Sequence, residues 1–432
     1  MNLPSIFKTI LISLICTPIY GLEITVTKKQ ATAMPIALVT VKPIMREIKN
    51  IAKIIAQDLQ VNNQFDVTTS SIQTLKKTKQ ITKFAQESKA LAIFLLSPEA
   101  DSIEWRLYNT MTGQMVNGKL VKREERTINQ WAHAIADQIW PLLTSEQGSF
   151  SSIIVACKQE IHKKNNKKFS HIYAFEPVAG ADQTKKAIVQ GDRINFAPRW
   201  HPKRAQLFYS QHCPFNVSLV SISPNRAPRT IMGFDGQNMT PAVSKKGRVV
   251  ISLSNCADAH LYEYQFDPIK KVGRFVQLTK GSGQYISPTF KGENEIVFCY
   301  INQRGRPSIG LLNTSTRDIS WITKEHGVSP CVSPDGSKLA YSSRKDNILQ
   351  LCTYDFNTKE TRQVTHDLHG HKDEGSWSPC GNYLVCSVEK GAQSRIACFH
   401  LPTQSCRFLT PTDEHWSFPV WSPIFEGKVP FL

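Results

Sequence analysis

Residues 328–343 read VSPCVSPDGSKLAYSS, which is a short apolar strand, a tight turn and a second apolar strand. In the turn, Pro334 fixes φ at the first corner, Asp335 caps the turn through its side chain, and Gly336 supplies the positive φ that the exit requires. Two more strand patterns follow, ILQLCTYDF from Ile348 and RQVT from Arg362. This unit therefore predicts four antiparallel strands.

The same pattern recurs between Ala197 and Pro423. The recurring anchor residue is Pro198, Pro241, Pro288, Pro330, Gly375 and Pro419, at steps of 43, 47, 42, 45 and 44 residues. Each motif alone indicates no more than a turn. Four-stranded units repeated at this period are typical of the blades of a β-propeller.

The repeat does not end evenly. The sixth copy of the pattern begins near Phe418, and too few residues follow it to form three more strands. Three strand patterns without a unit of their own begin upstream, at Ser152, Ser170 and Lys185. A ring leaves no open edge when one blade is built from both chain ends. We therefore predict a six-bladed propeller over residues 152–432, closed by strands from both ends of the chain.

A different pattern fills residues 22–145. An apolar strand over 36–41 precedes helical spacing at Ile44, Ile48, Ile51, Ile55 and Leu59. Strand patterns follow at 65–68, 91–96, 103–110 and 118–124, and a second amphipathic helix runs from Ile128 until Pro141 stops it. We predict a small α/β domain here, and hence an α+β chain of two domains.

Residues 1–21 resemble a signal peptide. Lys8 precedes a short apolar run, and Gly21 offers a small residue for cleavage. A lipoprotein alternative at Cys16 is disfavoured because Ile15 is bulky. The run is too short to remain as a membrane anchor, and no later segment approaches transmembrane length, so we expect export and no transmembrane segment in the mature chain.

Cysteine placement and charge limit the remaining classes. Most of the ten mature cysteines fall in strand patterns and are expected to be packed thiols, although a pair such as Cys380 with Cys386 stays open. The net charge of +17 favours weak attraction to anionic surfaces or acidic partners, or simply a solvated surface. Export and the lack of a reading motif argue against nucleic acid.

No catalytic motif is found. The chain has no GxSxG elbow, HExxH, P-loop or GxGxxG, so we expect neither an enzyme nor a cofactor. The best metal candidate is the set His366, His369 and His371. It falls between two blades, where polar residues are expected in any case, so the sequence assigns no metal site.

The order of these parts resembles the TolB family, the exported propeller component of the Tol-Pal cell-envelope system. The resemblance rests on IALV before the first helix, the helix from Trp131 to Asp137, the SPDG-type blades and FPVWSP near the C-terminus. It implies a monomeric, non-enzymatic periplasmic protein that binds the lipoprotein Pal and the inner-membrane protein TolA. Such proteins support outer-membrane invagination during cell division and outer-membrane integrity.

The resemblance also implies where the partners bind. The TolA-binding peptide corresponds to Leu22, Glu23, Ile24, Thr25, Val26 and Thr27. The Pal-binding surface corresponds to residues just before the blade anchors, namely Gln237, Asn238, Gln284, Tyr285, Gly327, Lys372, His415 and Trp416. The alternative is a periplasmic propeller that binds a glycan or small ligand in its channel. Pal binding that is lost on changing the 284/285 loop would separate the two hypotheses.

Overall fold

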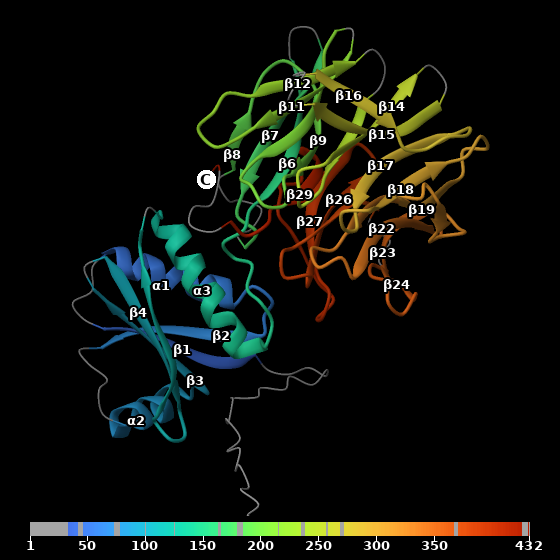
Figure 1. Cartoon of the computed structure of the whole chain (residues 1–432). Coiled ribbons are helices and arrows are strands. Elements are labelled where there is room, and N and C mark those ends of the chain that lie inside the picture. The colour runs from blue at the N-terminus through green and yellow to red at the C-terminus, as the bar shows by residue number, and fades with distance from the viewer. Residues whose placement is uncertain are drawn as a thin grey trace, which may run out of the picture.

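The computed structural model places an α/β domain beside a larger, strand-rich domain (Figure 1). No helix within the described part of the chain is long and apolar enough to cross a membrane. The expected signal peptide and the expected TolA-binding residues 22–27 lie outside the described residues. The structure describes residues 33–41, 46–72, 78–99, 101–124, 126–162, 166–178, 185–214, 216–234, 238–255, 258–267, 272–366, 370–425 and 431.

The first domain is one mixed sheet with helices on both faces. Its strands follow the order β2-β1-β3-β4-β5, with parallel pairing of β1 to β2 and β3 and antiparallel pairing from β3 to β5. The strands are β1 (Met34–Val41), β2 (Phe65–Ile72), β3 (Ala92–Pro98), β4 (Ser102–Asn109) and β5 (Met115–Lys122). The helices are α1 (Arg46–Leu59), α2 (Thr78–Ser88) and α3 (Ile128–Thr144).

Two apolar layers hold this domain together. Ile51 and Ile55 of α1 and Ile135 of α3 are fully buried against the face of the sheet that carries Leu38 and Phe94. Residues of α2 pack on the opposite face, against alternate residues of the same strands. The predicted strands and the first helix are confirmed, whereas α2 was not predicted.

The predicted stop at Pro141 is wrong. Helix α3 continues to Thr144 and ends at Ser145, which adopts the left-handed conformation with φ 60°. Proline removes one N–H donor from the last turn, but Trp140 and Leu143 on either side of it are buried in the domain core. Packing of these two side chains outweighs the loss of one hydrogen bond.

The second domain is built from four-stranded antiparallel groups. The described strands pair in six such groups, and single parallel bridges link two neighbouring pairs of groups into larger sheets. The innermost strands are β9 (Asn195–Trp200), β13 (Asn238–Val243), β17 (Gln284–Phe290), β21 (Val328–Val332), β25 (His371–Trp377) and β29 (His415–Trp421). The second strands are β10 (Leu207–His212), β14 (Val249–Asn255), β18 (Glu295–Ile301), β22 (Lys338–Lys345), β26 (Tyr383–Lys390) and β6 (Ile154–Ile161).

The outer half of each group completes the sheet. The third strands are β11 (Val217–Ile222), β15 (Asp258–Asp267), β19 (Pro307–Asn313), β23 (Ile348–Asp355), β27 (Gln393–His400) and β7 (Lys168–Phe175). The outermost strands are β12 (Arg229–Phe234), β16 (Val272–Gln277), β20 (Ile319–Trp321), β24 (Thr361–Gln363), β28 (Ser405–Phe408) and β8 (Lys186–Val189).

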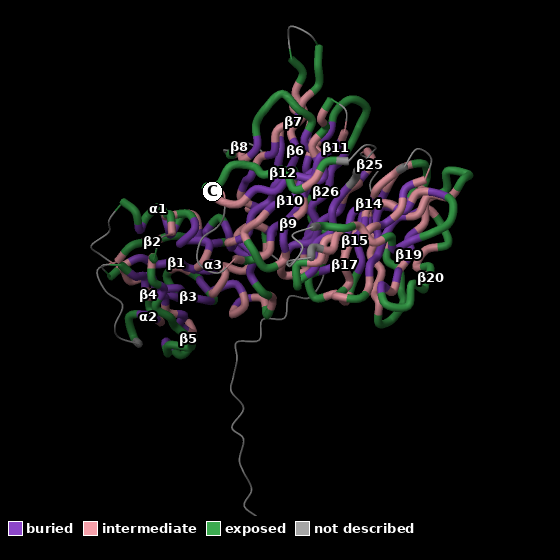
Figure 2. Tube along the Cα trace, turned by 45° about the horizontal axis from the view of Figure 1, so that its top comes forward, coloured by how far each residue is buried: buried purple, intermediate pink, exposed green. Residues whose placement is uncertain are grey.

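The inner strands form a closed ring. Each contacts the next, from β9 through β13, β17, β21 and β25 to β29, and β29 contacts β9 again. The last group has the order β29-β6-β7-β8, so it joins both ends of this domain, as predicted. Figure 2 shows buried residues along the middle of the strands and exposed residues in the peripheral loops. The prediction of an α/β domain followed by a propeller is confirmed.

None of the nine cysteines within the described ranges is disulfide-bonded to another of them. Cys380 and Cys386 do not pair. The Cys380 thiol lies in a turn, 3.2 Å from the Ser378 hydroxyl, and donates a hydrogen bond to Ser149 of the linker at 3.6 Å. Cys386 is fully buried within β26.

Candidate functional site: the two mouths of the propeller channel

Every inner strand contains the same backbone irregularity. The strand register shifts at one point in each, so that two residues oppose one on the neighbouring strand. The residue before each anchor has positive φ, namely Ala197 (49°), Thr240 (33°), Ser287 (51°), Ser329 (51°), Glu374 (59°) and Phe418 (51°). The sequence repeat therefore marks a β-bulge in each blade.

The channel inside the ring of inner strands has two mouths. Each inner strand is the first strand of its group, so all six run in the same direction along the channel. We call the mouth where they begin the entry mouth and the mouth where they end the exit mouth. All the predicted Pal-contacting residues that the structure describes lie at or near strand beginnings, and hence at the entry mouth. Gln237 lies outside the described residues.

Several predicted contact residues are not at the surface. Tyr285, Gly327, Lys372 and Trp416 are buried. The Tyr285 hydroxyl donates to the carbonyl oxygen of Lys280 at 3.0 Å, and its ring lies 4.8 Å from that of Tyr300. Their burial favours a supporting role beneath the surface, and their direct contact with the lipoprotein stays a prediction. Their local sequences could not show this, since turns and buried strand starts share the same residue types.

Gln284 and His415 remain partly exposed at the entry mouth. Gln284 pairs with Ala259 of the preceding group, and His415 pairs with Ser394 in the same way. Both residues therefore sit where two neighbouring groups meet. Asn238 begins β13.

Sequence analysis missed an ionic cluster beside Trp416. The ammonium group of Lys158 lies 2.7 Å from the Glu414 carboxylate and 3.4 Å from that of Glu160. The Glu414 carboxylate also accepts the Trp416 indole N–H at 2.7 Å. Burial alone would raise the pKa of Glu414, but the hydrogen bonds from Lys158 and Trp416 and the charge of Lys158 outweigh burial and lower this pKa. Lys158 and Glu160 lie in β6, whereas Glu414 comes just before β29 at the other end of the domain. Only the pairing of β6 with β29, which closes the ring, brings these three residues together.

The channel interior holds two charged residues that depart from the repeat. Arg199 follows its anchor where the other units have Ala242, Thr289, Cys331, Ser376 and Val420. Glu374 precedes its anchor, where four of the other five units have alanine, serine or threonine. Burial raises the pKa of Glu374 to about 7, with a further contribution from Asp373, although Phe418 N–H, Ser387 and Arg199 oppose the shift. Comparison of the repeats with one another could have identified both residues.

The exit mouth is hollow. A cavity of about 390 Å³ is lined by residues at the ends of all the inner strands, and Arg199 is among them. Its aromatic walls are Trp200, Phe290, Trp377 and Trp421. The C-terminal segment contributes Pro423 and Ile424 to the rim. This cavity was not predicted.

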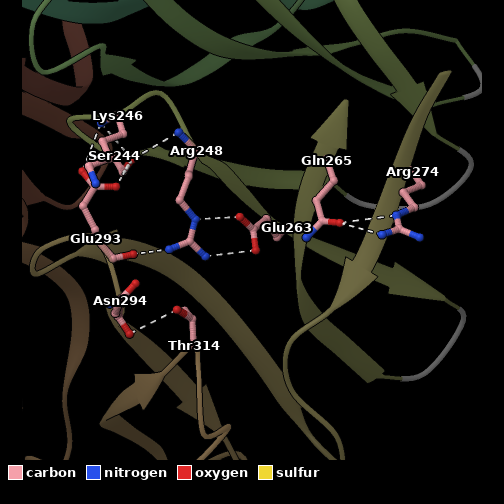
Figure 3. Close-up of polar contacts among 9 residues, drawn as sticks. All are labelled: Ser244, Lys246, Arg248, Glu263, Gln265, Arg274, Glu293, Asn294 and Thr314. Carbon is pink, nitrogen blue, oxygen red and sulfur yellow. Dashed lines mark hydrogen bonds and ion pairs between the residues drawn. The ribbon is translucent and has the colours of Figure 1, made fainter. Parts of the chain in front are cut away.

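Polar contacts hold two neighbouring turns of the exit rim together (Figure 3). The Ser244 hydroxyl donates to one Glu293 oxygen at 2.9 Å, and the Lys246 backbone N–H donates to the other at 3.0 Å. Arg248 binds both oxygens of Glu263, at 2.7 and 3.0 Å, and donates to the carbonyl oxygen of Glu293. These bonds use the local carboxylates and fix this part of the cavity wall.

The three histidines named as the best metal candidate fall only partly within the described residues. His369 lies outside the described residues, and Nδ1 of His371 accepts the backbone N–H of Leu349 at 3.1 Å. Within the described ranges, no three His, Cys, Asp or Glu residues are placed to hold a metal ion.

The two domains meet through a buried histidine. Nδ1 of His133 on α3 lies 2.8 Å from Asp58 of α1, and its Nε2 lies 3.5 Å from Glu176, which follows β7. Burial alone would lower the pKa of His133, but the two facing carboxylates outweigh it and raise the pKa. Nearby, Asn62 donates to the Tyr383 hydroxyl at 2.6 Å, and Arg407 donates to the carbonyl oxygen of Val61 at 3.4 Å.

Known proteins share both the sequence pattern and the fold. The Tol-Pal system protein TolB of Ruthia magnifica subsp. Calyptogena magnifica is 23% identical over 259 residues, which is 58% of this chain and 60% of that protein. That alignment thus spans less than two thirds of the relative. The crystal structure of TolB from Acinetobacter baumannii matches with a TM-score of 0.74 and 19% identity, covering 91% of this chain and 97% of that chain, which shows a shared fold.

Family comparison covers both domains. The TolB amino-terminal domain matches residues 22–116, and the TolB beta propeller domain matches residues 140–425. The second match alone spans more than half of the chain. Together with the ring of bulged inner strands, it shows that this protein belongs to the TolB family.

Proposed function

We propose that this chain is a non-enzymatic protein–protein interaction component of a Tol-Pal system. It acts in the periplasm after removal of residues 1–21, as a monomer. It binds a Pal-type peptidoglycan-associated lipoprotein and links it to a TolA-type inner-membrane protein. In this role it supports outer-membrane invagination during cell division and outer-membrane integrity.

One observation carries the proposal. The TolB beta propeller domain matches residues 140–425, so the likeness extends through the domain that would hold the lipoprotein. The entry mouth supports this role, because partly exposed polar residues from different blades meet there. Polar side chains over a rigid ring suit a specific but reversible protein contact.

Burial narrows the surface that the lipoprotein would contact. We propose Gln284 and His415 as contact residues, with the Lys158–Glu414 pair beside them. Tyr285 and Trp416 would act indirectly, because their rings hold the loops from beneath. The TolA-type contact is assigned to residues 22–27 from the resemblance alone.

The test is a calorimetric titration of residues 22–432 against the soluble domain of the Pal-type lipoprotein from the same cell. We expect saturable one-to-one binding that weakens at least tenfold in the double variant Gln284→Ala/His415→Ala. The matched control Lys245→Ala changes the exit mouth and should bind normally. No binding at high protein concentration would reject the proposal and favour a channel that binds a glycan or small ligand.

A further inference from the structure

The cavity at the exit mouth has a mixed lining. Most of it is apolar, with three tryptophans, Phe290 and several prolines from successive blades. At about 390 Å³ it has the size of a small-molecule site. Its ring of contributing strands is rigid, because each inner strand is hydrogen-bonded along its length to the next strand of its group.

Arg199 lines the exit-mouth cavity. It belongs to β9, yet the groups that influence its charge are Cys331, Glu374 and Cys157, which come from β21, β25 and β6. Burial lowers the pKa of Arg199. Residues of three other blades thus contribute to the electrostatic environment of Arg199.

No carboxylate of the described residues is hydrogen-bonded to the Arg199 guanidinium. Its only hydrogen bond within the described part of the chain runs from Nη1 to the carbonyl oxygen of Pro198, at 2.8 Å. Glu374 influences Arg199 electrostatically, but the hydrogen bonds of its carboxylate are made by Oε2, which accepts the Phe418 N–H at 2.5 Å and the Ser387 hydroxyl at 3.0 Å. A guanidinium has five donors, so most of its capacity remains for a ligand.

Other carboxylates near the cavity are also committed. Asp335 at the rim accepts hydrogen bonds from Ser333 and Ser337, at 2.5 and 2.6 Å. Glu293 is bound by Ser244 and Lys246, as Figure 3 shows. The buried indole N–H of Trp200 lines the same cavity and has no hydrogen-bond acceptor among the described residues. Within that part of the chain, the cavity therefore offers donors of Arg199 and Trp200 that are hydrogen-bonded to no carboxylate.

We propose that the exit-mouth cavity binds a small organic carboxylate with an apolar body, the carboxylate resting on Arg199. The planar fork of a guanidinium matches the two oxygens of a carboxylate, and enclosure by protein strengthens that pairing. The tryptophan and proline walls receive the apolar body. This inference goes beyond the proposed function, because the lipoprotein is assigned to the entry mouth.

The test uses two ligands of nearly the same size and shape, one with a carboxylate and one with an uncharged carboxamide. Binding of 3-phenylpropionate and of 3-phenylpropanamide to residues 22–432 is followed by calorimetry and by tryptophan fluorescence. We expect the acid to bind at least ten times more tightly than the amide. Acetyl-Pro-Phe with a free or an amidated C-terminus then shows whether the carboxylate can also be the C-terminus of a peptide. A preference for the free C-terminus extends the site to peptides. No such preference restricts the site to small organic acids.

Arg199→Met should abolish the preference for the acid, whereas Arg199→Lys should retain part of it. Folding should survive, because small residues occupy the same position in the other blades. The control is Arg204→Met, an exposed arginine in the following turn that does not line the cavity. Equal binding of acid and amide, or an equal effect of Arg204→Met, would overturn the proposal.

Discussion

At the scale of single residues, the structure separates side chains that shape the channel from those that face it. Tyr285 and Trp416 have the aromatic character expected of binding residues, yet both are packed under loops. Arg199 and Glu374 match no motif when the sequence is followed along the chain. Each differs, however, from most of the residues at the same position in the other repeats. In a propeller, the informative comparison is therefore between blades of the same chain.

Glu374 provides a residue-scale prediction about pH. Its pKa rises from 4.5 in the unfolded chain to about 7 in the fold, so the folded protein keeps a proton that the unfolded chain releases. Stability should therefore fall as pH rises from 4.5 to 7, by up to about 3 kcal/mol. Glu374→Gln keeps the hydrogen bonds and should remove this fall.

The measurement is urea unfolding of both proteins at pH 5, 6, 7 and 8. The difference in unfolding free energy between Glu374→Gln and the natural chain should grow with pH. Glu360→Gln, an exposed carboxyl group in the turn after β23, is the matched control and should show no such trend. A pH-independent difference for Glu374→Gln would contradict the prediction.

At the scale of elements, the sequence predicts what local rules determine. Turn chemistry at a fixed period is sufficient to place the four-stranded units, and apolar spacing is sufficient to place α1. It did not predict α2, because TKQITKFAQES is polar and contributes mainly Ile81 and Ala85 to the core. The bulges were also missed, because the residues with positive φ before the anchors share no distinctive residue type.

The bulge itself yields the element-scale prediction. Ser329 has φ 51° within β21, a conformation that is costly for β-branched side chains. Ser329→Val should lower the free energy of unfolding by about 1–2 kcal/mol, whereas Ser329→Gly should be neutral or slightly stabilising. Chemical unfolding midpoints provide the measurement.

Its control is Ser320→Val in the exposed outer strand β20, where valine suits the extended backbone and should change little. Equal destabilisation by the two valine variants would mean that the bulge conformation is not responsible.

At the scale of the whole molecule, the candidate site depends on closure that no local pattern reveals. The Lys158–Glu414 pair joins residues from opposite ends of the second domain, and the exit cavity needs every inner strand. The sequence could predict that a ring exists and which loops approach its mouths. It could not predict which side chains are buried there, because burial depends on the neighbouring blade.

The domain interface provides the prediction at this scale. His133 is held between Asp58 of its own domain and Glu176 of the propeller, so Glu176→Gln removes an ionic contact between the domains while leaving the His133–Asp58 pair intact. Because the Glu176 side chain is partly solvated, we expect a coupling of about 1 kcal/mol. Amide exchange in α1 and α3 should then accelerate severalfold, while exchange in β22 and β26 stays unchanged.

Glu160→Gln on β6, whose carboxylate faces Lys158 rather than the first domain, is the control and should leave α1 and α3 protected. If Glu176→Gln also leaves them protected, the remaining contacts, such as Asn62 with Tyr383, are sufficient to hold the domains together, and a signal between them would have to pass through those contacts instead.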